Sequence, residues 1–382
     1  MDLDPHKTRP SPLVLVVDLA ADDAPFGSYG AVAASGQRLL AAELSRRLGA
    51  QGAAVARLPE EATRPGFHWG SWFAAAARAA RREAEAGSRP LDAIGYAGAG
   101  SGALLDDAGL DGLVSPVPGE VVTNNRYSAD AFVVAGDLDA ALEALAACAT
   151  DNAAVRCLEA VGFRWRDLSS HPWARFDVDT PLDLALLRLA TRLPGTRILD
   201  GVVSAYLEMA RLPGGGGLEV PGLAALGEVI RSRDAELVVA GRVPSSAWAY
   251  LETETACRVR CYVEERGMRS ARDHAPRSLL AAWSERLGAA DLVQELASLG
   301  DAVILDTRVL MAARAGSADA ATWPPAEERF ASDFLDRARS GDRWLGELVA
   351  AAAEAPLPFV LGGHALVSDG LRILTDISWQ GH

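Results

Sequence analysis

The stretch RFDVDTPLDLALL (residues 175–187) combines closely spaced acids with the signals of a helix start. Thr180 is a candidate N-cap, a proline follows it at the first helical position, and Asp183 lies in the first turn. This pattern predicts a short extended segment that passes into an apolar helix. Asp177 and Asp179 lie two residues apart and would point the same way from an extended segment, so they are candidate metal ligands. The alternative is that Thr180 and Asp183 only cap a helix, while Asp177 and Asp179 are solvated loop acids.

Length and composition narrow the class of protein. The chain has 382 residues, which is long for one hydrophobic core, so two domains are expected. No uninterrupted apolar run approaches the roughly 20 residues that a membrane span requires, and no membrane association is predicted. The first twelve residues, MDLDPHKTRPSP, lack the apolar core of a signal peptide, which favours a cytoplasmic location.

Charge and cysteine content argue against two further classes. The formal net charge of −14 at pH 7 argues against nucleic-acid binding, which needs a basic face, although a small anionic ligand could bind locally. The four cysteines are too few and too scattered for a disulfide framework, and no pair has the spacing of a zinc ribbon. A small-molecule partner is therefore expected, and a homo-oligomer is left open.

Strand and helix patterns alternate through the first half of the chain. LVLVVDLA (residues 13–20) is a continuous apolar run, which predicts a strand buried on both faces of a parallel sheet. Helices are predicted at residues 37–48 and 69–86, and further strands at 52–59 and in the first part of 91–105. This order predicts right-handed crossovers and helices on both faces of a mostly parallel sheet.

Gly98 and Gly100 lie in a glycine-rich turn after the third predicted strand. Glycines in such turns can present backbone N–H groups to a phosphate. The spacing is neither a dinucleotide fingerprint nor a Walker loop, and small residues also allow tight strand-to-helix packing. Both interpretations stay open.

A dense polar connection separates two apolar β runs between residues 120 and 136. It contains Asn124, Asn125, Arg126 and Asp130. Amide and guanidinium groups offer donors and acceptors in fixed geometry, so this segment predicts binding to the edge of a nucleobase or a sugar. The alternative is an ordinary polar loop.

Taken together, these features resemble the nucleotidyltransferase fold of the glycosyltransferase-A type. The features are the β-α-β-α-β start, the polar connection, a helix followed by Val-Gly-Phe (residues 161–163) and a strand, and the closing DVDTPLDL. Residues 13–193 most resemble the molybdenum-cofactor guanylyltransferase and 2-phospho-L-lactate guanylyltransferase group. The resemblance implies a bound nucleotide or phosphorylated metabolite, with Mg²⁺ and catalysis at Asp177 and Asp179. It also implies substrate binding at Thr180 and along the polar connection.

The sequence departs from this family at two places. The loop after the first strand, AADDAPFGSYG (residues 20–30), carries two acids and no base, where the family grips a triphosphate with basic residues. No acid stands at the end of the third predicted strand, where the family tends to place an Asp. The expectation is therefore a diverged or inactive guanylyl- or cytidylyltransferase. The alternative is a non-catalytic ligand-binding or assembly protein on the same scaffold.

Four consecutive glycines, at residues 214–217, mark the clearest predicted boundary, because such a run is costly inside a helix or strand. The predicted domains are a nucleotidyltransferase-like α/β domain at 1–200, a connecting helix and linker at 201–217, and a second, Rossmann-like α/β domain at 218–382. Strand and helix patterns alternate again in the second half. The predicted fold class is thus α/β with two mostly parallel sheets.

Polar residues follow several predicted strands of the second half, where the carboxyl ends of parallel strands would meet. The candidates are Arg242, Glu264, Arg266, Asp306 and His364. Ligands bind at such strand ends in open α/β sheets, so these residues are candidate ligand contacts.

A weaker alternative for the second half is a hydrolase that uses His364 as a base. Asp306 and either Ser246 or Ser368 could complete a triad with it. No Gly-x-Ser-x-Gly nucleophile elbow accompanies these residues, and a lone histidine is more often a turn residue.

Overall fold

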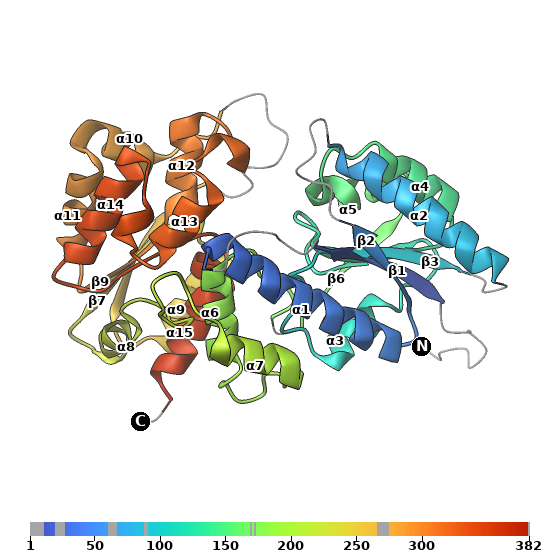
Figure 1. Cartoon of the computed structure of the whole chain (residues 1–382), viewed down its shortest axis with the longest axis horizontal. Helices are drawn as coiled ribbons and strands as arrows, with labels where there is room; N and C mark the ends of the chain where they lie inside the picture. Colours follow the sequence, from blue (N-terminus) through green and yellow to red (C-terminus); the bar gives the residue numbers. More distant parts are fainter. Residues whose placement is uncertain are drawn as a thin grey trace. The chain divides into compact units, whose positions relative to one another are not determined.

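The computed structural model describes residues 11–19, 27–59, 67–87, 91–168, 170–171, 173–265 and 275–380. Within them the chain forms two compact α/β units (Figure 1). The first unit comprises the described residues of Met1–Asp22 and Gln37–Asp177, and the second those of Asp23–Gly36 and Val178–His382.

The first unit is built on a six-stranded sheet in the order β2-β1-β3-β5-β4-β6. All of its strands run parallel except β5, which is antiparallel to both β3 and β4. Helices α2, α4 and α5 cover one face, and α3 lies with the second half of α1 on the other (Figure 1). The strands are β1 (Pro12–Asp18), β2 (Ala54–Pro59), β3 (Ala93–Ala97), β4 (Glu120–Thr123), β5 (Ala131–Ala135) and β6 (Arg164–Asp167). The helices are α1 (Tyr29–Ala50), α2 (Trp69–Ala86), α3 (Asp107–Leu113), α4 (Leu138–Ala146), the 3₁₀ turn η1 (Asp151–Ala153) and α5 (Ala154–Ala160).

The core of the first unit follows from the continuous apolar strands. Strand β1 is buried from Leu13 to Val17, as expected for a strand covered on both faces. On the α2 side, Trp69 and Phe73 stack at 5.2 Å between ring centroids and meet Phe132 edge-on. Such aromatic packing fixes α2 against the sheet.

The second unit is built on a four-stranded, fully parallel sheet in the order β10-β9-β7-β8. Helices α10 to α14 lie on one face, and α6, α8, α9 and α15 lie on the other (Figure 1). The strands are β7 (Glu236–Gly241), β8 (Arg258–Val263), β9 (Ala302–Asp306) and β10 (Phe359–Gly362). The helices are α6 (Pro181–Ala190), α7 (Gly201–Met209), α8 (Leu223–Arg231), α9 (Ser245–Glu254), α10 (Leu279–Leu287), α11 (Ala289–Ala297), α12 (Thr307–Ala315), α13 (Ala326–Asp333), α14 (Arg343–Glu354) and α15 (Leu371–Ser378), with short turns η2 (Ala320–Thr322), η3 (Arg337–Arg339) and η4 (Leu366–Gly370).

The predicted fold class is confirmed, because both units are mostly parallel sheets flanked by helices. The division of the chain differs from the predicted one. The glycines at 214–217 form a turn inside the second unit, where the Leu212 N–H donates to the Gly216 carbonyl. Helix α7 also belongs to the second unit, where the Arg188 and Glu208 side chains pair at 2.7 Å.

No helix in the described part of the chain combines the length and the apolar character that crossing a membrane requires.

Candidate functional site

The strand order of the second sheet creates a natural ligand position. Strand β8 lies on one side of β7, whereas the next strands, β9 and β10, lie on the other side. Ligands in open parallel sheets bind at the carboxyl edge beside such a reversal. Here β7 ends at Gly241 and β9 ends at Asp306. A Cβ on Gly241, whose φ is +135°, would lie 2.3 Å from the Asp306 Cβ, so only glycine allows these strand ends to approach.

Arg242 and Asp306 form an ion pair at this position. The Arg242 Nε and Nη2 atoms donate to the two Asp306 carboxylate oxygens at 2.5 and 3.0 Å. The Asp306 side chain is fully buried, whereas 14% of the Arg242 side chain is exposed. Burial acts to raise the pKa of Asp306, but the charge and hydrogen bonds of Arg242, with His364, outweigh it and hold this pKa below its ordinary value.

A second ion pair lies deeper, where α12 and α13 meet. The Arg308 guanidinium donates to both Asp333 oxygens at 2.6 Å and to the Thr307 hydroxyl at 2.9 Å. Thr307 in turn donates to the Gly362 carbonyl at the end of β10. Burial raises the pKa of Asp333 to about 6, while Arg308 opposes the rise. Both side chains are buried, so each charge depends on the other for its stabilisation.

The helix start predicted at Thr180 brings a further acid, Asp183, into the electrostatic field of Asp333 and Arg308. Thr180 and Asp183 form a complete capping box at the start of α6. One Asp183 oxygen accepts the backbone N–H groups of Asp179 and Thr180 at 3.0 and 2.8 Å. Burial, with the negative charges of Asp179 and Asp333, raises the pKa of Asp183 to about 7. We call Asp183, Arg242, Asp306, Arg308 and Asp333 the charge cluster.

The structure shows how the acids of the 175–187 stretch differ in burial. The sequence singled out Asp177 and Asp179, but Asp179 is exposed and Asp183 is the buried acid of this stretch. Asp333 was missed altogether, because a single acid at the end of α13 carries no local pattern. The signal that did find the cluster was the recurrence of polar residues after apolar strands, which selected Arg242 and Asp306.

The other second-unit candidates occupy different positions. Glu264 accepts hydrogen bonds from the Ser278 hydroxyl and the Leu280 N–H at the start of α10, so it caps that helix. His364 follows β10 and acts electrostatically on Asp306. Arg266 lies outside the described residues.

The geometry disfavours the predicted triad. The Ser368 hydroxyl donates to the backbone carbonyl of His364 at 2.8 Å, not to its ring. Both Asp306 oxygens are engaged by the Arg242 guanidinium. A triad acid must instead hold the imidazole of the base.

In the first unit, the predicted polar connection is held by hydrogen bonds within itself and to α5. Asn124 is buried, its amide donates to the Asp130 carboxylate at 3.2 Å, and its oxygen accepts the Ala131 N–H. Arg126 binds both Glu159 oxygens, at 3.1 and 2.7 Å. The Asn125 side chain accepts the backbone N–H of Tyr127. These contacts shape the β4–β5 connection.

The glycine-rich turn shows a similar use of its donors. The Gly98 N–H donates to the Asp130 carbonyl at 2.8 Å, so this amide is not directed at a phosphate. Gly100 is buried in the same turn. The turn therefore packs β3 against the polar connection.

The predicted metal ligands belong to different units, because the division falls between Asp177 and Val178. The described residues contain no group of three or more His, Cys, Asp or Glu side chains that could hold a metal ion. Mg²⁺ that is bound through one or two carboxylates and substrate phosphates needs no such group. Magnesium therefore stays a prediction.

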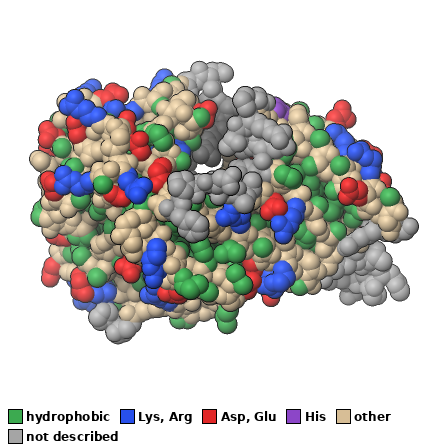
Figure 2. Space-filling model, in the orientation of Figure 1, with side chains coloured by type: hydrophobic (Ala, Val, Ile, Leu, Met, Phe, Trp, Pro, Cys, Tyr) green, Lys and Arg blue, Asp and Glu red, His purple; other side chains and the backbone are tan. Residues whose placement is uncertain are grey.

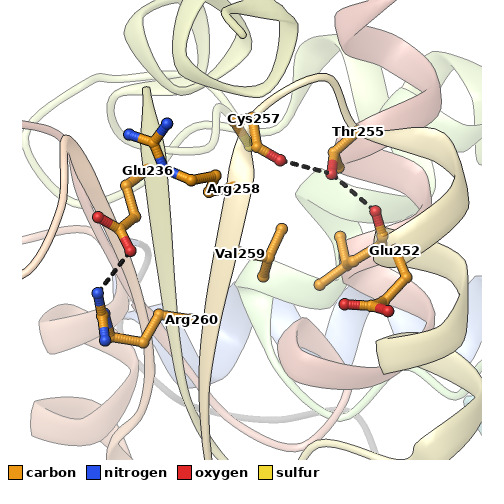
Figure 3. A pocket seen from close by; sticks show the side chains of 8 residues that line it. Glu236, Glu252, Thr255, Cys257, Arg258, Val259 and Arg260 are labelled. Carbon is orange, nitrogen blue, oxygen red and sulfur yellow. Dashed lines mark hydrogen bonds and ion pairs between the residues drawn. The ribbon is translucent and has the colours of Figure 1, made fainter. Parts of the chain in front are cut away.

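A separate hollow lies beside the edge strand β8 (Figure 3). Its volume is about 420 Å³, and the Arg260 and Glu236 side chains pair at 2.6 Å along its wall. It contains none of the predicted site residues. Its lining residues are Glu236, Leu251, Glu252, Thr255, Cys257, Arg258, Val259 and Arg260.

Comparison with known proteins adds nothing to this geometry. No family model matches the chain. No curated protein and no solved structure is similar enough to count as a match. What the site can do has to be inferred from its own residues.

Proposed function

We propose that this protein binds a small phosphorylated metabolite or a nucleotide, and that the phosphate lies at the carboxyl edge of the second sheet, against Arg242. The observation that carries the proposal is the position of Arg242 at the strand-order reversal, held there by buried Asp306. The Arg242 Nε and Nη2 atoms donate to the Asp306 carboxylate. The Arg242 Nη1 edge is therefore directed away from Asp306. A guanidinium held in this way suits an anion, because its direction is already fixed.

Helix α9 adds donors next to Arg242. It begins three residues after Arg242, and its N-cap, Pro244, makes no side-chain hydrogen bond to the first turn. Ser245 and Ser246, the first two residues of α9, are exposed. Backbone N–H groups at such a helix start favour phosphate.

We further propose that the first unit is a nucleotidyltransferase-like domain, diverged or inactive as a guanylyl- or cytidylyltransferase. The proposal is supported by the sequence resemblance of residues 13–193. Burial raises the pKa of the Tyr96 hydroxyl in β3, and the negative charges of Asp151, Asp130 and Asp177 add to the rise. Mg²⁺ that is held by one or two carboxylates together with nucleotide phosphates would need no larger group of acids. The proposal includes Mg²⁺ at Asp177 or Asp179 and a cytoplasmic location. The alternative is a non-catalytic binding role for the same protein.

Ligand-induced thermal stabilisation tests the phosphate site. The melting temperature is measured with inorganic phosphate, pyrophosphate, GTP and CTP, each with and without Mg²⁺. A ligand at 100 times its Kd adds about 2.7 kcal/mol of stability, which gives a clear shift. We expect the shift in the wild type and its loss in Arg242→Ala. Arg260→Ala, which removes a more exposed ion pair outside the site, should keep the shift.

Two outcomes would overturn the phosphate site: no shift with any of these ligands in the wild type, or an undiminished shift in Arg242→Ala. The nucleotidyltransferase proposal has its own readout, which is pyrophosphate release from GTP or CTP with phosphorylated acceptors. Asp177→Ala should abolish such release and leave phosphate binding at Arg242 intact. If the ligand-induced shift in melting temperature is lost in Arg242→Ala and no pyrophosphate is released, the non-catalytic binding role is favoured.

A further inference from the structure

A continuous network of hydrogen bonds leads from Arg242 to the end of α13. The Asp306 carboxylate accepts two bonds from the Arg242 guanidinium and also accepts the backbone N–H of Arg308, at 3.1 Å. The Arg308 side chain in turn donates to both carboxylate oxygens of Asp333. Two arginines and two aspartates therefore alternate along one series of contacts that leads inward from the proposed phosphate site.

The inner part of this network is shielded from water. Acidic and basic side chains are interspersed over the face of the molecule shown in Figure 2, where water solvates them. By contrast, the Asp306 and Asp333 side chains have no exposed surface, and the Arg308 side chain is only 8% exposed. A buried guanidinium cannot exchange a lost carboxylate for water, so it needs another acceptor within the protein.

Two other carboxylates act electrostatically on Arg308. Burial acts to lower the pKa of Arg308, while the negative charges of Asp333, Asp306 and Asp183 raise it. Asp183 already accepts two backbone N–H groups at the start of α6. Asp306 is already bonded to the backbone of Arg308, and it is also the residue that holds Arg242. Capture of Asp306 by the Arg308 side chain would therefore affect Arg242 directly.

We propose that Asp333 is a positioning residue for phosphate binding, which holds the Arg308 guanidinium away from Asp306 and so leaves the Asp306 carboxylate to Arg242. Without the charge of Asp333, Arg308 turns to Asp306 and competes with Arg242 for its two oxygens. Arg242 then loses the fixed direction that suits an anion. The inference rests on the proposed phosphate site, although Asp333 itself is fully buried and does not touch the ligand.

Isothermal titration calorimetry of the full chain with inorganic phosphate and pyrophosphate tests this role. Asp333→Asn removes the charge and keeps the size of the side chain. We expect it to bind both ligands about tenfold more weakly than the wild type, because the direction of the Arg242 guanidinium then has to be fixed on binding. The double variant Asp333→Asn/Arg308→Met also lacks the competing guanidinium. It should regain the affinity of the wild type.

A loss of stability that leaves the network intact is the matched control. Leu345→Ala empties a fully buried position on α14, so it should lower the melting temperature without changing phosphate affinity. Melting temperatures without ligand identify the variants that fold. The double variant leaves no buried charge unpaired, and we expect it to fold even where Asp333→Asn alone does not.

The wild type offers a second measurement that needs no change at Asp333. Burial raises the pKa of Asp333 to about 6, where Arg308 and Arg329 oppose the rise and Asp306 adds to it. Asp183 of α6 lies in the same electrostatic field. As the pH falls through 6, Asp333 takes up a proton and releases Arg308. The phosphate Kd of the wild type divided by that of the double variant should therefore rise between pH 7.5 and pH 5, and the titration of phosphate itself cancels in this ratio.

The remaining results overturn the inference. Undiminished affinity in Asp333→Asn, or a ratio that is constant with pH, shows that Arg308 does not capture Asp306. The phosphate site itself still stands in that case if Arg242→Ala abolishes binding. A loss that the double variant does not restore, or an equal loss in Leu345→Ala, assigns Asp333 a structural role only. A wild type that binds neither ligand removes the phosphate site and this inference with it.

Discussion

Asp183 links a local helix signal to the buried charges of the second unit. Its carboxylate completes the capping box of α6, yet its side chain is buried and lies within the field of Asp333. A capping acid is normally solvated and gains stability from its charge. At this position burial disfavours the charged form. The Asp183 carboxylate therefore stabilises the start of α6 by hydrogen bonds, while its negative charge is unfavourable next to the other acids.

The raised pKa of Asp183 predicts a pH dependence of stability. The folded-state pKa is about 7, whereas an unfolded aspartate titrates near pH 3.9. Between these values the folded state binds a proton that the unfolded state releases. The contribution of Asp183 to the free energy of unfolding is therefore greatest at low pH and falls by about 1.4 kcal/mol per pH unit until pH 7. Asp183→Asn should remove this slope, because asparagine keeps an acceptor for the two N–H groups and does not titrate.

Urea unfolding at pH 5, 6, 7 and 8 measures the difference between Asp183→Asn and the wild type. The variant should gain stability relative to the wild type as the pH rises, and the gain should level off above pH 7. Asp137→Asn is the matched control, since Asp137 is also an N-cap but is exposed. A difference that stays constant across the four pH values would refute the prediction.

For individual residues, the sequence indicated which polar side chains lie near strand ends, but not which of these side chains are buried or already hydrogen-bonded. Asn124 and Arg126 stood out as a binding segment, yet their hydrogen bonds go to Asp130 and Glu159. Glu159 lies 33 residues from Arg126, so no local pattern could show that the guanidinium has a partner.

Helix α1 shows how a contact distant in sequence extends an element. The sequence predicted its start near residue 37, but it begins at Tyr29. The N–H groups of Tyr29 and Gly30 donate to the two oxygens of Glu327 at 2.9 and 3.0 Å. The Tyr29 ring also stacks on Phe334, at 5.6 Å between centroids. A carboxylate at a helix N-terminus is favourable, so Glu327 adds to the local cap, in which the Ser28 hydroxyl accepts the Ala31 N–H at 3.0 Å.

By contrast, helix α2 begins and ends where the sequence predicted it, at residues 69 and 86. Its apolar residues recur at helical spacing, and His68 caps its first turn through Nδ1. The bounds of α2 were therefore predicted from its own sequence, whereas the start of α1, where Ser28 caps the helix and Glu327 of α13 adds two contacts, was not.

Removing the Glu327 carboxylate should loosen the start of α1. In Glu327→Ala the two N–H groups lose their acceptor, which typically costs about 0.5–2 kcal/mol. Hydrogen exchange of residues 29–36 should become faster, while the amides in the second half of α1 keep their protection. Glu347→Ala, which changes an exposed acid on the neighbouring helix α14, should leave exchange at 29–36 unchanged. Unchanged exchange in Glu327→Ala would show that the Tyr29 packing and the Ser28 cap set the helix start without Glu327.

For the whole molecule, the sequence predicted two α/β units but placed their boundary differently. A run of glycines is a sound signal for a break in regular structure, and a turn is indeed found there. Whether a turn separates domains depends on which core the flanking helices join, and this is set by packing far along the chain. Leu182 of α6 lies against Gly362 at the end of β10, although 180 residues separate them in sequence.

The position of the boundary predicts how fragments behave. A fragment of residues 218–382 begins after the glycine run and lacks α6 and α7. It therefore loses the fully buried Leu182, Leu184 and Leu186, together with the acid that caps α6. Each missing large side chain typically costs about 2–5 kcal/mol, so the loss of three is comparable to the whole stability of a typical domain. We expect no cooperative thermal transition from 218–382. A fragment of residues 178–382 keeps α6 and should unfold cooperatively, at a lower temperature than the full chain because it lacks the first turns of α1. Cooperative unfolding of both fragments at the same temperature would instead place the boundary at the glycine run.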